Sequence, residues 1–456
     1  MRTTEQRTVE ELDRRYVFHP FTQLDQHATS TAPVIVEGKG VTLHASDGRT
    51  YLDAMAGLWC VNVGYGRREI AEALRDEANR LGYYHAFSSM STDLPAQVAE
   101  RVLSLYPTPM SRVFFGNSGS DANDTQVKLV WYYNNVLGRT GKKKIVSRQR
   151  GYHGVTVMTA GLTGLPSLHA GFDAPLPMIR HTTAPHRLWE GRPDESEEEF
   201  AQRMADDLEQ LILAEGPDTV AAFIGEPVLG AGGVIVPPRT YWRRIQEVLR
   251  RYDVLLIADE VITGFGRLGR WFGAEEFGIE PDLATVAKGI TSGYFPLSGC
   301  LVSEQVWNVL VEGGATLGAF GHGYTYSAHP LAAAAALANL DVLERDGLVE
   351  QAAARGAFMH ERLRGAFADH PIVADVRGLG LIGAVEFAPG AEPFDPALKV
   401  GPRVYARCLE QGLITRALPA SDTIAFSPPF VVSEAELEEM IAIARRAVDE
   451  VAEELP

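Results

Sequence analysis

The sequence predicts an α/β fold, in which a mostly parallel sheet carries helices on both faces and a smaller α+β domain lies beside it. Short apolar runs alternate with helical stretches through the middle of the chain, which is typical of parallel strands joined by crossover helices. The length of 456 residues also exceeds what one small core requires. We therefore expect a large domain over residues 64–330 and a small domain built from residues 1–63 and 331–456.

Six apolar runs predict the buried strands of the large sheet. They span residues 113–115, 144–147, 220–224, 254–258, 283–287 and 298–302. Helices are predicted between several of them, at residues 121–137, 197–214 and 241–251. Because ligands bind at the carboxyl ends of the strands in such sheets, polar residues that directly follow these runs are the candidates for a site.

The two ends of the chain have a different pattern. Residues 34–53 predict a hairpin with turns at 38–40 and 47–48. Beyond Pro330 the sequence predicts a long helix, strands within 373–387 and 412–426, and a closing helix over 433–453. Ser433, with Glu436 and Glu438, provides an N-terminal cap for that last helix. These pieces are expected to pack together as the small domain.

Composition excludes several classes of function. A net charge of -17 repels nucleic acid and anionic membranes, so neither is expected as a partner. The three cysteines are far apart and lack metal-ligand spacing, which argues against a disulfide framework and a zinc ribbon and favours a reducing cytoplasm. The polar first six residues show no signal peptide, and no apolar run is long enough to span a membrane. No metal is predicted.

Two glycine patterns resemble a dinucleotide fingerprint, at residues 264–269 and 378–383. That fingerprint requires a helix to open at its end. A strand-like run follows Gly383, whereas five residues separate the strand ending at Ala258 from Gly264. Both patterns are therefore interpreted as turns or packing glycines, and an oxidoreductase that uses them is the weaker alternative.

Three polar residues with complementary chemistry follow neighbouring apolar runs. Asp259 and Lys288 each end a predicted strand, and Glu226 ends a third. Aligned parallel strands would bring Asp259 and Lys288 into one cleft. Taken alone, such a pair is most often a structural ion pair. However, residues 116–120 form a glycine- and serine-rich loop before a helix, which offers N–H groups to a phosphate.

A lysine, a buried acid and a phosphate loop are what pyridoxal phosphate requires. The lysine forms a Schiff base with its aldehyde. The acid keeps the pyridine nitrogen protonated, so that the ring accepts electrons from a carbanion. The sequence therefore predicts an enzyme that uses this cofactor.

Residues 257–272 and 281–289 carry a longer resemblance. Over nearly its whole length the chain resembles class III (omega) aminotransferases, which belong to the fold-type-I pyridoxal-phosphate superfamily. The resemblance implies a seven-stranded sheet. It also implies that Lys288 carries the cofactor and transfers the proton, that Asp259 pairs with the pyridine nitrogen, and that Val261 packs on one face of the ring. A decarboxylase, aminomutase or racemase on the same scaffold is the alternative, and a non-catalytic regulator is a more remote one.

Further motifs match this family. Residues 151–154 resemble the motif in which Tyr152 stacks on the other ring face, with His153 beside it, and Glu226 resembles a glutamate that supports the site. Residues 323–327 resemble a segment that reaches the neighbouring subunit's phosphate, which implies a homodimer, or a tetramer formed as a dimer of dimers. The residues that the resemblance assigns to the phosphate are Ser118, Gly119 and Ser120 of one subunit and Tyr324 and Thr325 of its partner.

The substrate residues are assigned by the same resemblance. Arg416 resembles the arginine that grips the keto-acid carboxylate, and Trp59 and Phe87 resemble the aromatic walls of the pocket. Ala231 and Ile262 replace a glutamate and a glutamine of the ornithine and gamma-aminobutyrate branch. These replacements favour the pyruvate-accepting branch. The amine donor stays open among taurine, beta-alanine, diamines, polyamines, and hydrophobic or amino-polyol amines.

Overall fold

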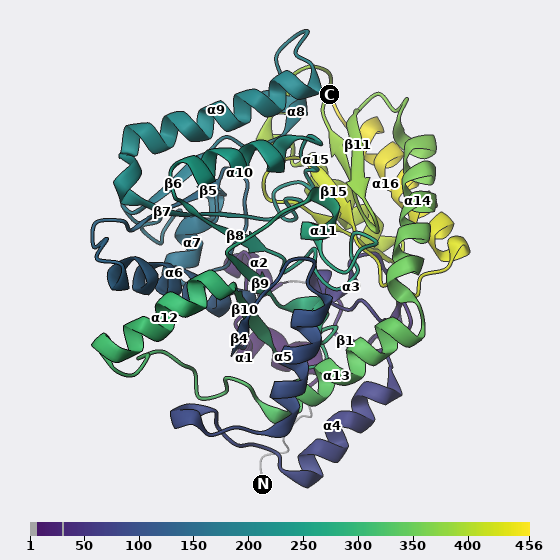
Figure 1. Ribbon diagram of the computed structural model, residues 1–456. Coiled ribbons are helices and arrows are strands. Elements are labelled where there is room, and N and C mark those ends of the chain that lie inside the picture. The colour runs from purple at the N-terminus through teal and green to yellow at the C-terminus, as the bar shows by residue number, and fades with distance from the viewer. Residues whose placement is uncertain (1–6, 30–31) are drawn as a thin grey trace.

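The computed structural model describes residues 7–29 and 32–456, and a seven-stranded sheet lies at its centre (Figure 1). The strand order is β4–β10–β9–β8–β7–β5–β6. Strands β9, β8, β7, β5 and β6 are mutually parallel, whereas β10 is antiparallel to both of its neighbours. The predicted mostly parallel sheet is confirmed, and all six apolar runs are strands of it. The strands are β4 (Arg112–Gly116), β5 (Lys144–Arg148), β6 (Ile179–Thr182), β7 (Val220–Gly225), β8 (Leu255–Asp259), β9 (Leu283–Val286) and β10 (Ser298–Val302).

The seventh strand, β6, has no counterpart among the apolar runs. Only Ile179 of its four residues is apolar; the others are Arg180, His181 and Thr182. β6 lies at the edge of the sheet and pairs with β5 alone. A strand this short, with one apolar residue, has no alternation by which the sequence would indicate it.

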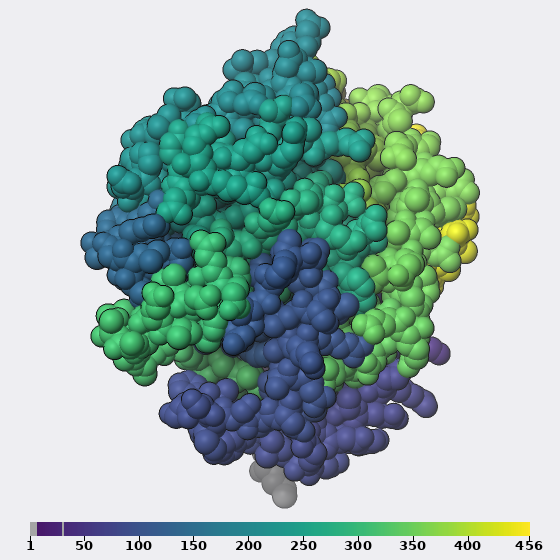
Figure 2. Space-filling view, viewed as in Figure 1, coloured from purple at the N-terminus to yellow at the C-terminus, as the bar shows by residue number. Residues whose placement is uncertain are grey.

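Helices cover both faces of the sheet, as predicted. In β8, Leu256 and Ala258 join the core that contains α9 and α10, whereas Leu255 and Ile257 pack with α6. Figure 2 shows the blue segment with α5 over the middle of one side of the molecule, between green α12 and light-green α14. The helices of this region are α5 (Asp93–Leu105), α6 (Gly119–Val136), α7 (Val157–Leu162), α8 (Arg187–Glu190), α9 (Glu197–Glu215), α10 (Tyr241–Arg251), α11 (Gly273–Phe277) and α12 (Glu304–Leu317).

Two smaller sheets contain the strands near the chain ends. In the first, Leu413 and Ile414 of β13 pair in parallel with Leu52 and Asp53 of β3, so the two ends of the chain share a sheet. This pairing supports the proposal that both ends form one small domain, while its boundaries stay a prediction. The first sheet contains β1 (Ile35–Lys39), β2 (Thr42–Ala45), β3 (Thr50–Asp53) and β13 (Leu413–Ile414), and the second contains β11 (Val373–Leu379), β12 (Ile382–Phe387), β15 (Thr423–Phe426) and β14 (Arg416–Ala417).

The predicted strand regions 373–387 and 412–426 are each divided into shorter strands. Residues 378–383, one of the two glycine patterns, form the turn of the β11–β12 hairpin. Gly380 has a φ of +57°, and a Cβ there would lie 2.3 Å from the backbone of Leu268, so both conformation and space require glycine. The other pattern, 264–269, lies in turns. Neither opens a helix, as expected.

The remaining helices complete the two ends. Ser433 caps α16 in a capping box with Glu436, as predicted, whereas Glu438 lies beyond the cap and pairs with Arg362. The large-domain boundary predicted at Pro330 coincides with the first residue of α13. These helices are α1 (Val9–Tyr16), α2 (Leu24–His27), α3 (Ala56–Trp59), α4 (Arg68–Arg80), α13 (Pro330–Arg345), α14 (Leu348–Phe367), α15 (Val400–Glu410) and α16 (Glu434–Glu453).

Two sequence-based expectations concern a signal peptide and a membrane-spanning segment. The first six residues, where no signal peptide was expected, lie outside the described part of the chain. Within the described part, none of the helices combines the length and the apolar character that crossing a membrane requires. The three cysteines, Cys60, Cys300 and Cys408, are free thiols.

Candidate active site

Three adjacent strands place the predicted acid and base at one edge of the sheet. Glu226 follows β7, Asp259 ends β8, and Lys288 follows β9. The pairing of Asp259 with Thr285 aligns the ends of β8 and β9. All three side chains line one cavity of about 390 Å³. The expectation that strand ends bring Asp259 and Lys288 into one cleft is thus met.

Most of the other predicted site residues line the same cavity. Together with Lys288, Asp259 and Glu226, they are Trp59, Gly119, Ser120, Tyr152, His153, Val261 and Arg416. Ser118, Phe87, Tyr324 and Thr325 do not line it. The sequence did not indicate Asn123, Leu58, Pro20 or Phe21, which line it as well.

Asp259 is held by a network of donors. Its Oδ2 accepts hydrogen bonds from Asn123 Nδ2 and His153 Nδ1, each at 2.8 Å, and its Oδ1 accepts one from the Val261 N–H at 3.1 Å. Asn123 also donates to the His153 carbonyl at 2.8 Å. The carboxylate is only 3% exposed. A buried, fixed carboxylate on a cavity wall suits a cationic ring nitrogen, because it supplies the opposite charge.

Lys288 projects into the cavity from a strained turn. Its φ is +46°, a left-handed value that costs energy for a residue with a Cβ. The turn is fixed by Asn339 Nδ2, which donates to the carbonyls of Gly289 and Ile290 at 2.9 and 3.0 Å. Burial lowers the pKa of Lys288, although Asp259 acts in the opposite direction. A lysine with a lowered pKa serves as nucleophile and base near neutral pH.

The predicted phosphate loop joins β4 to α6. The Asp121 carboxylate accepts the N–H groups of Asn117 and Ser118, and the Ser118 hydroxyl accepts the Asp121 N–H at 3.1 Å. The Ser118 hydroxyl therefore caps the helix. The N–H groups of Gly119 and Ser120 have no acceptor among the described residues. An N-terminus of this kind accommodates a phosphate.

Glu226 supports the cavity wall through backbone contacts. Its carboxylate oxygens accept the Tyr152 N–H at 3.0 Å and the Gly230 N–H at 2.8 Å. Burial raises the pKa of Glu226, and the charge of His153 acts against this. Glu226 thereby fixes the segments that carry Tyr152 and Ala231, both of which line the cavity.

Arg416 begins β14 and forms the cationic end of the cavity. It makes no hydrogen bond or ion pair with an acidic side chain in the described part of the chain. Burial lowers its pKa, whereas Tyr152 and Tyr405 raise it. A partly buried guanidinium without an anionic neighbour is suited to binding a carboxylate from a ligand.

Phe87 and the 323–327 segment lie together on the surface, outside the chain's own cavity. Phe87 is 46% exposed, and a Cβ on Gly323 would contact its ring at 3.2 Å. The Tyr324 hydroxyl donates to the Asp121 carbonyl at 3.0 Å, and the Tyr83 hydroxyl donates to the Thr325 carbonyl at 2.6 Å. Their assignment to a partner's site stays a prediction.

Glu260, the acid next to Asp259, has a structural role that the sequence did not indicate. Its carboxylate accepts the N–H groups of Gly273 at 2.9 Å and Ala274 at 2.6 Å, as well as the Thr263 hydroxyl. These contacts fix the start of α11. Burial raises the pKa of Glu260 to about 7, which is opposed by the Thr263 hydroxyl and the two N–H groups.

The raised pKa of Glu260 predicts a pH-dependent stability. Because its pKa is about 7 in the fold and 4.5 otherwise, its contribution is fully present below about pH 4.5 and is lost as the pH rises to about 7. We expect Glu260→Gln to have a lower unfolding free energy, and therefore a lower Tm, than wild type at about pH 5. The difference in unfolding free energy between the two proteins should shrink by ~3 kcal/mol by about pH 8. Thermal unfolding of both proteins at the two pH values measures this. A pH-independent gap would contradict the assignment.

Known proteins resemble the chain over nearly its whole length. The profile of the family described as aminotransferase class-III matches residues 24–448. A diaminobutyrate–2-oxoglutarate transaminase of Halomonas elongata is 51% identical, over 97% of this chain and 96% of its own. The chloroplastic gamma aminobutyrate transaminase 3 of Solanum lycopersicum is 45% identical, over 92% of this chain and 81% of its own.

A solved structure agrees in fold as well. The omega transaminase from Pseudomonas jessenii in complex with PMP superposes with a TM-score of 0.95 at 46% identity, covering 98% of this chain and 99% of its own. The class III aminotransferases use pyridoxal phosphate, and the lysine, buried acid, and free helix N-terminus on the cavity wall fit that group. With the family profile, the relatives and the fold in agreement, the chain belongs to the class III aminotransferases.

Proposed function

We propose that this aminotransferase moves an amino group from a primary amine or omega-amino acid to a keto acid, with pyruvate as the acceptor. The observation that carries the proposal is the placement of Lys288 and Arg416 in one cavity, where Arg416 has no acidic partner among the described residues. A lysine at the reacting carbon and a guanidinium for a carboxylate are the two groups that a keto-acid half-reaction requires.

Each residue of the cavity has its own role in this proposal. When bound, pyridoxal phosphate supplies an aldehyde for the amino group and a ring that accepts electrons. Lys288 would carry the cofactor and move the proton at the substrate carbon, for which its lowered pKa is suited. Asp259 would pair with the ring nitrogen, and the N–H groups of Gly119 and Ser120 would hold the phosphate. Tyr152 and Val261 would pack against the ring.

Support for the acceptor comes from two apolar residues of the cavity wall. Ala231 and Ile262 line the cavity, so no acidic side chain from those positions neutralises Arg416. A keto acid therefore meets an available guanidinium. The relatives named for diaminobutyrate and gamma-aminobutyrate are consistent with an omega-amino acid as donor, and the name of the former includes 2-oxoglutarate as acceptor.

The half-reactions can be separated by absorbance. Purified protein supplied with pyridoxal phosphate is titrated with single amines and no keto acid, and then with pyruvate or with 2-oxoglutarate. We expect a donor to change the cofactor absorbance, and pyruvate to restore it with formation of one alanine per site. If no amine changes the spectrum, transamination of these donors is excluded. If only 2-oxoglutarate restores it, pyruvate is the wrong acceptor.

Arg416 provides a more specific test. We expect Arg416→Ala to raise the KM for pyruvate by about 10- to 100-fold, because a charge-assisted bidentate pair is lost. The half-reaction with an uncharged amine should change little, because that substrate has no carboxylate. Arg270→Ala, which removes an exposed arginine paired with Glu275 and Glu276, is the matched control. An equal loss in both half-reactions would assign Arg416 a structural role.

We further propose a homodimer as the working unit. Phe87 and the 323–327 segment contribute to a surface on which Tyr83, Tyr84, Met90, Phe320 and Tyr326 are also exposed. An apolar surface of this kind is typical of subunit contacts. It is continuous with the residues that the family resemblance assigns to the partner's phosphate.

A threonine variant tests the shared site. We expect Thr325→Ala to weaken binding of pyridoxal phosphate by about 10-fold, because one hydrogen bond to a charged group is lost. Dialysis against decreasing cofactor measures this, with Thr316→Ala as the control, since the Thr316 hydroxyl donates to the Gly313 carbonyl within α12. A monomer in light scattering that retains full activity would contradict the shared site.

A further inference from the structure

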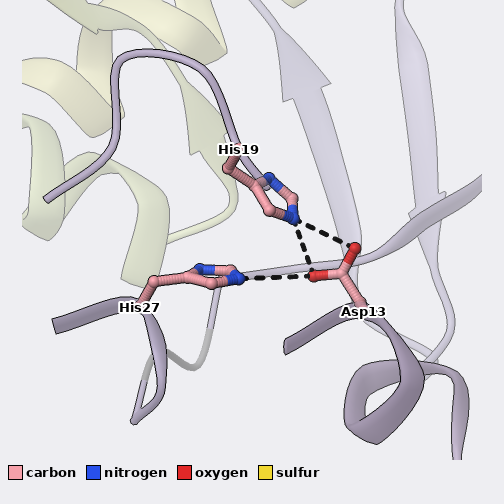
Figure 3. Close-up of side chains that lie close together, drawn as sticks. All are labelled: Asp13, His19 and His27. Carbon is pink, nitrogen blue, oxygen red and sulfur yellow. Dashed lines mark hydrogen bonds and ion pairs between the residues drawn. The ribbon is translucent and has the colours of Figure 1, made fainter. Parts of the chain in front are cut away.

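Three metal-ligating side chains converge in the N-terminal segment. Asp13 comes from α1, His19 from the loop after it, and His27 from the end of α2 (Figure 3). One ligand atom from each lies within 4.8 Å of the others. None of these three residues is assigned to the aminotransferase reaction.

The contacts within the cluster leave one nitrogen unsatisfied. His19 Nε2 lies 3.1 and 3.0 Å from the two carboxylate oxygens of Asp13. His27 Nε2 lies 4.0 Å from Asp13 Oδ2, too far for a hydrogen bond. This nitrogen is buried and has no hydrogen-bond partner among the described residues. A buried polar atom without a partner is destabilising. A group bound between the two imidazoles and the carboxylate would give this nitrogen a partner.

We propose that Asp13, His19 and His27 bind a divalent transition-metal ion of the zinc type. Two imidazole nitrogens and one carboxylate oxygen, with a water in the fourth position, are a common ligand set for Zn²⁺. Ligand atoms around a tetrahedral zinc ion lie about 3.3 Å apart. The 3.0 Å separation of His19 Nε2 from Asp13 Oδ2 is close to this value, whereas the 4.0 Å separation of His27 Nε2 from the same oxygen would have to shorten when the ion binds. Calcium and magnesium prefer oxygen ligands and fit less well.

The surroundings leave room for the ion and its water. The three side chains line a hollow of about 360 Å³, which Thr22, Glu10 and Arg14 also line. Glu10 and Arg14 carry opposite charges. Glu10 is held by a hydrogen bond from the Ser46 hydroxyl, outside the proposed ligand set.

The ion would connect this segment to the active-site cavity. His19 and His27 lie on either side of Pro20 and Phe21, both of which line the cavity that contains Lys288. An ion bound by both histidines and by Asp13 of α1 would fix the ends of this segment relative to each other. The site thus positions Phe21 without contacting the substrate.

Metal uptake tests the site without reference to activity. Holoenzyme without an affinity tag is treated with a chelator, desalted and titrated with Zn²⁺ by calorimetry. We expect one ion per chain, with binding weakened about 10-fold or more in His19→Gln and in His27→Gln. His44→Gln is the matched control, because His44 is a half-buried histidine of β2 whose Nδ1 lies 3.2 Å from the Thr50 hydroxyl, outside the proposed ligand set. Unchanged cofactor absorbance and circular dichroism establish that the variants fold.

Two further results would decide the question. Co²⁺ in place of Zn²⁺ should give visible absorption bands in wild type that His27→Gln lacks. Zn²⁺ should also slow tryptic cleavage after Arg15, which is exposed in α1, in wild type but not in His27→Gln. If wild type binds no more Zn²⁺ than a His19→Gln/His27→Gln double variant, the proposal is wrong. If binding leaves cleavage after Arg15 unchanged, the ion does not hold the segment.

Discussion

Replacing Lys288 with alanine should lower kcat for transamination by about 10⁴-fold, the largest effect expected of any single substitution in this chain. Lys288 lines the cavity beside Asp259, and burial lowers its pKa. Its loss removes both the covalent attachment of the cofactor and the base at the substrate carbon. Alanine formation from pyruvate and an amine, followed over hours at high enzyme concentration, measures the residual rate.

A control variant tests whether the loss of kcat is specific to Lys288 or follows from removing any lysine charge. Lys39→Ala removes an exposed lysine in β1, and we expect it to retain wild-type kcat. Cofactor binding should persist in Lys288→Ala, because Asp259 and the α6 N-terminus remain. A variant that binds the cofactor and turns over amine at a rate near wild type would refute the assignment of Lys288.

Asp259→Asn should lower kcat by about 10³-fold, the second largest effect. Asparagine keeps the shape and accepts the bonds from Asn123 and His153 through one oxygen, but it removes the negative charge. The electron-accepting capacity of the ring depends on that charge through its nitrogen. The half-reaction rate with a saturating amine measures the loss directly.

Glu260→Gln is the matched control for Asp259→Asn. It replaces the carboxyl group of the next residue along the chain, which accepts the N–H groups of Gly273 and Ala274, by an amide, and above about pH 8 it removes a negative charge. We expect it to change stability, as described above, and to leave kcat within about 3-fold of wild type. Equal losses of kcat in the two variants would show that the effect is not specific to the carboxylate of Asp259.

The sequence was most informative where strands are short and fully buried. β7 and β8 have no polar side chain before Glu226 and Asp259, and the polar residue within β9 is Thr285, so Glu226, Asp259 and Lys288 stand out as charged groups at or just after strand ends. Alignment of parallel strands then brings them together. This part of the site follows from local pattern and one general rule of topology.

Other parts of the site depend on contacts that no local pattern indicates. Asn123 is an ordinary polar residue within α6, and only the fold brings it to 2.8 Å from Asp259. Pro20 and Phe21 come from a loop that folds back on the cavity. The division of 373–387 into β11 and β12 depends on Gly380, whose close approach to Leu268 is a tertiary contact. The periodicity of the sequence does not predict tertiary contacts of this kind.

The pairing of β3 with β13 has a consequence for biosynthesis. β3 is made early, whereas β13 and Arg416 emerge from the ribosome more than three hundred residues later. Long-range strand pairing of this kind closes late and slowly. Lys288 and Asp259 are therefore synthesised well before Arg416, which forms the cationic end of their cavity. The edge of β3 that pairs with β13 also stays unpaired until translation is nearly finished. Such an edge is where a chaperone would be needed most.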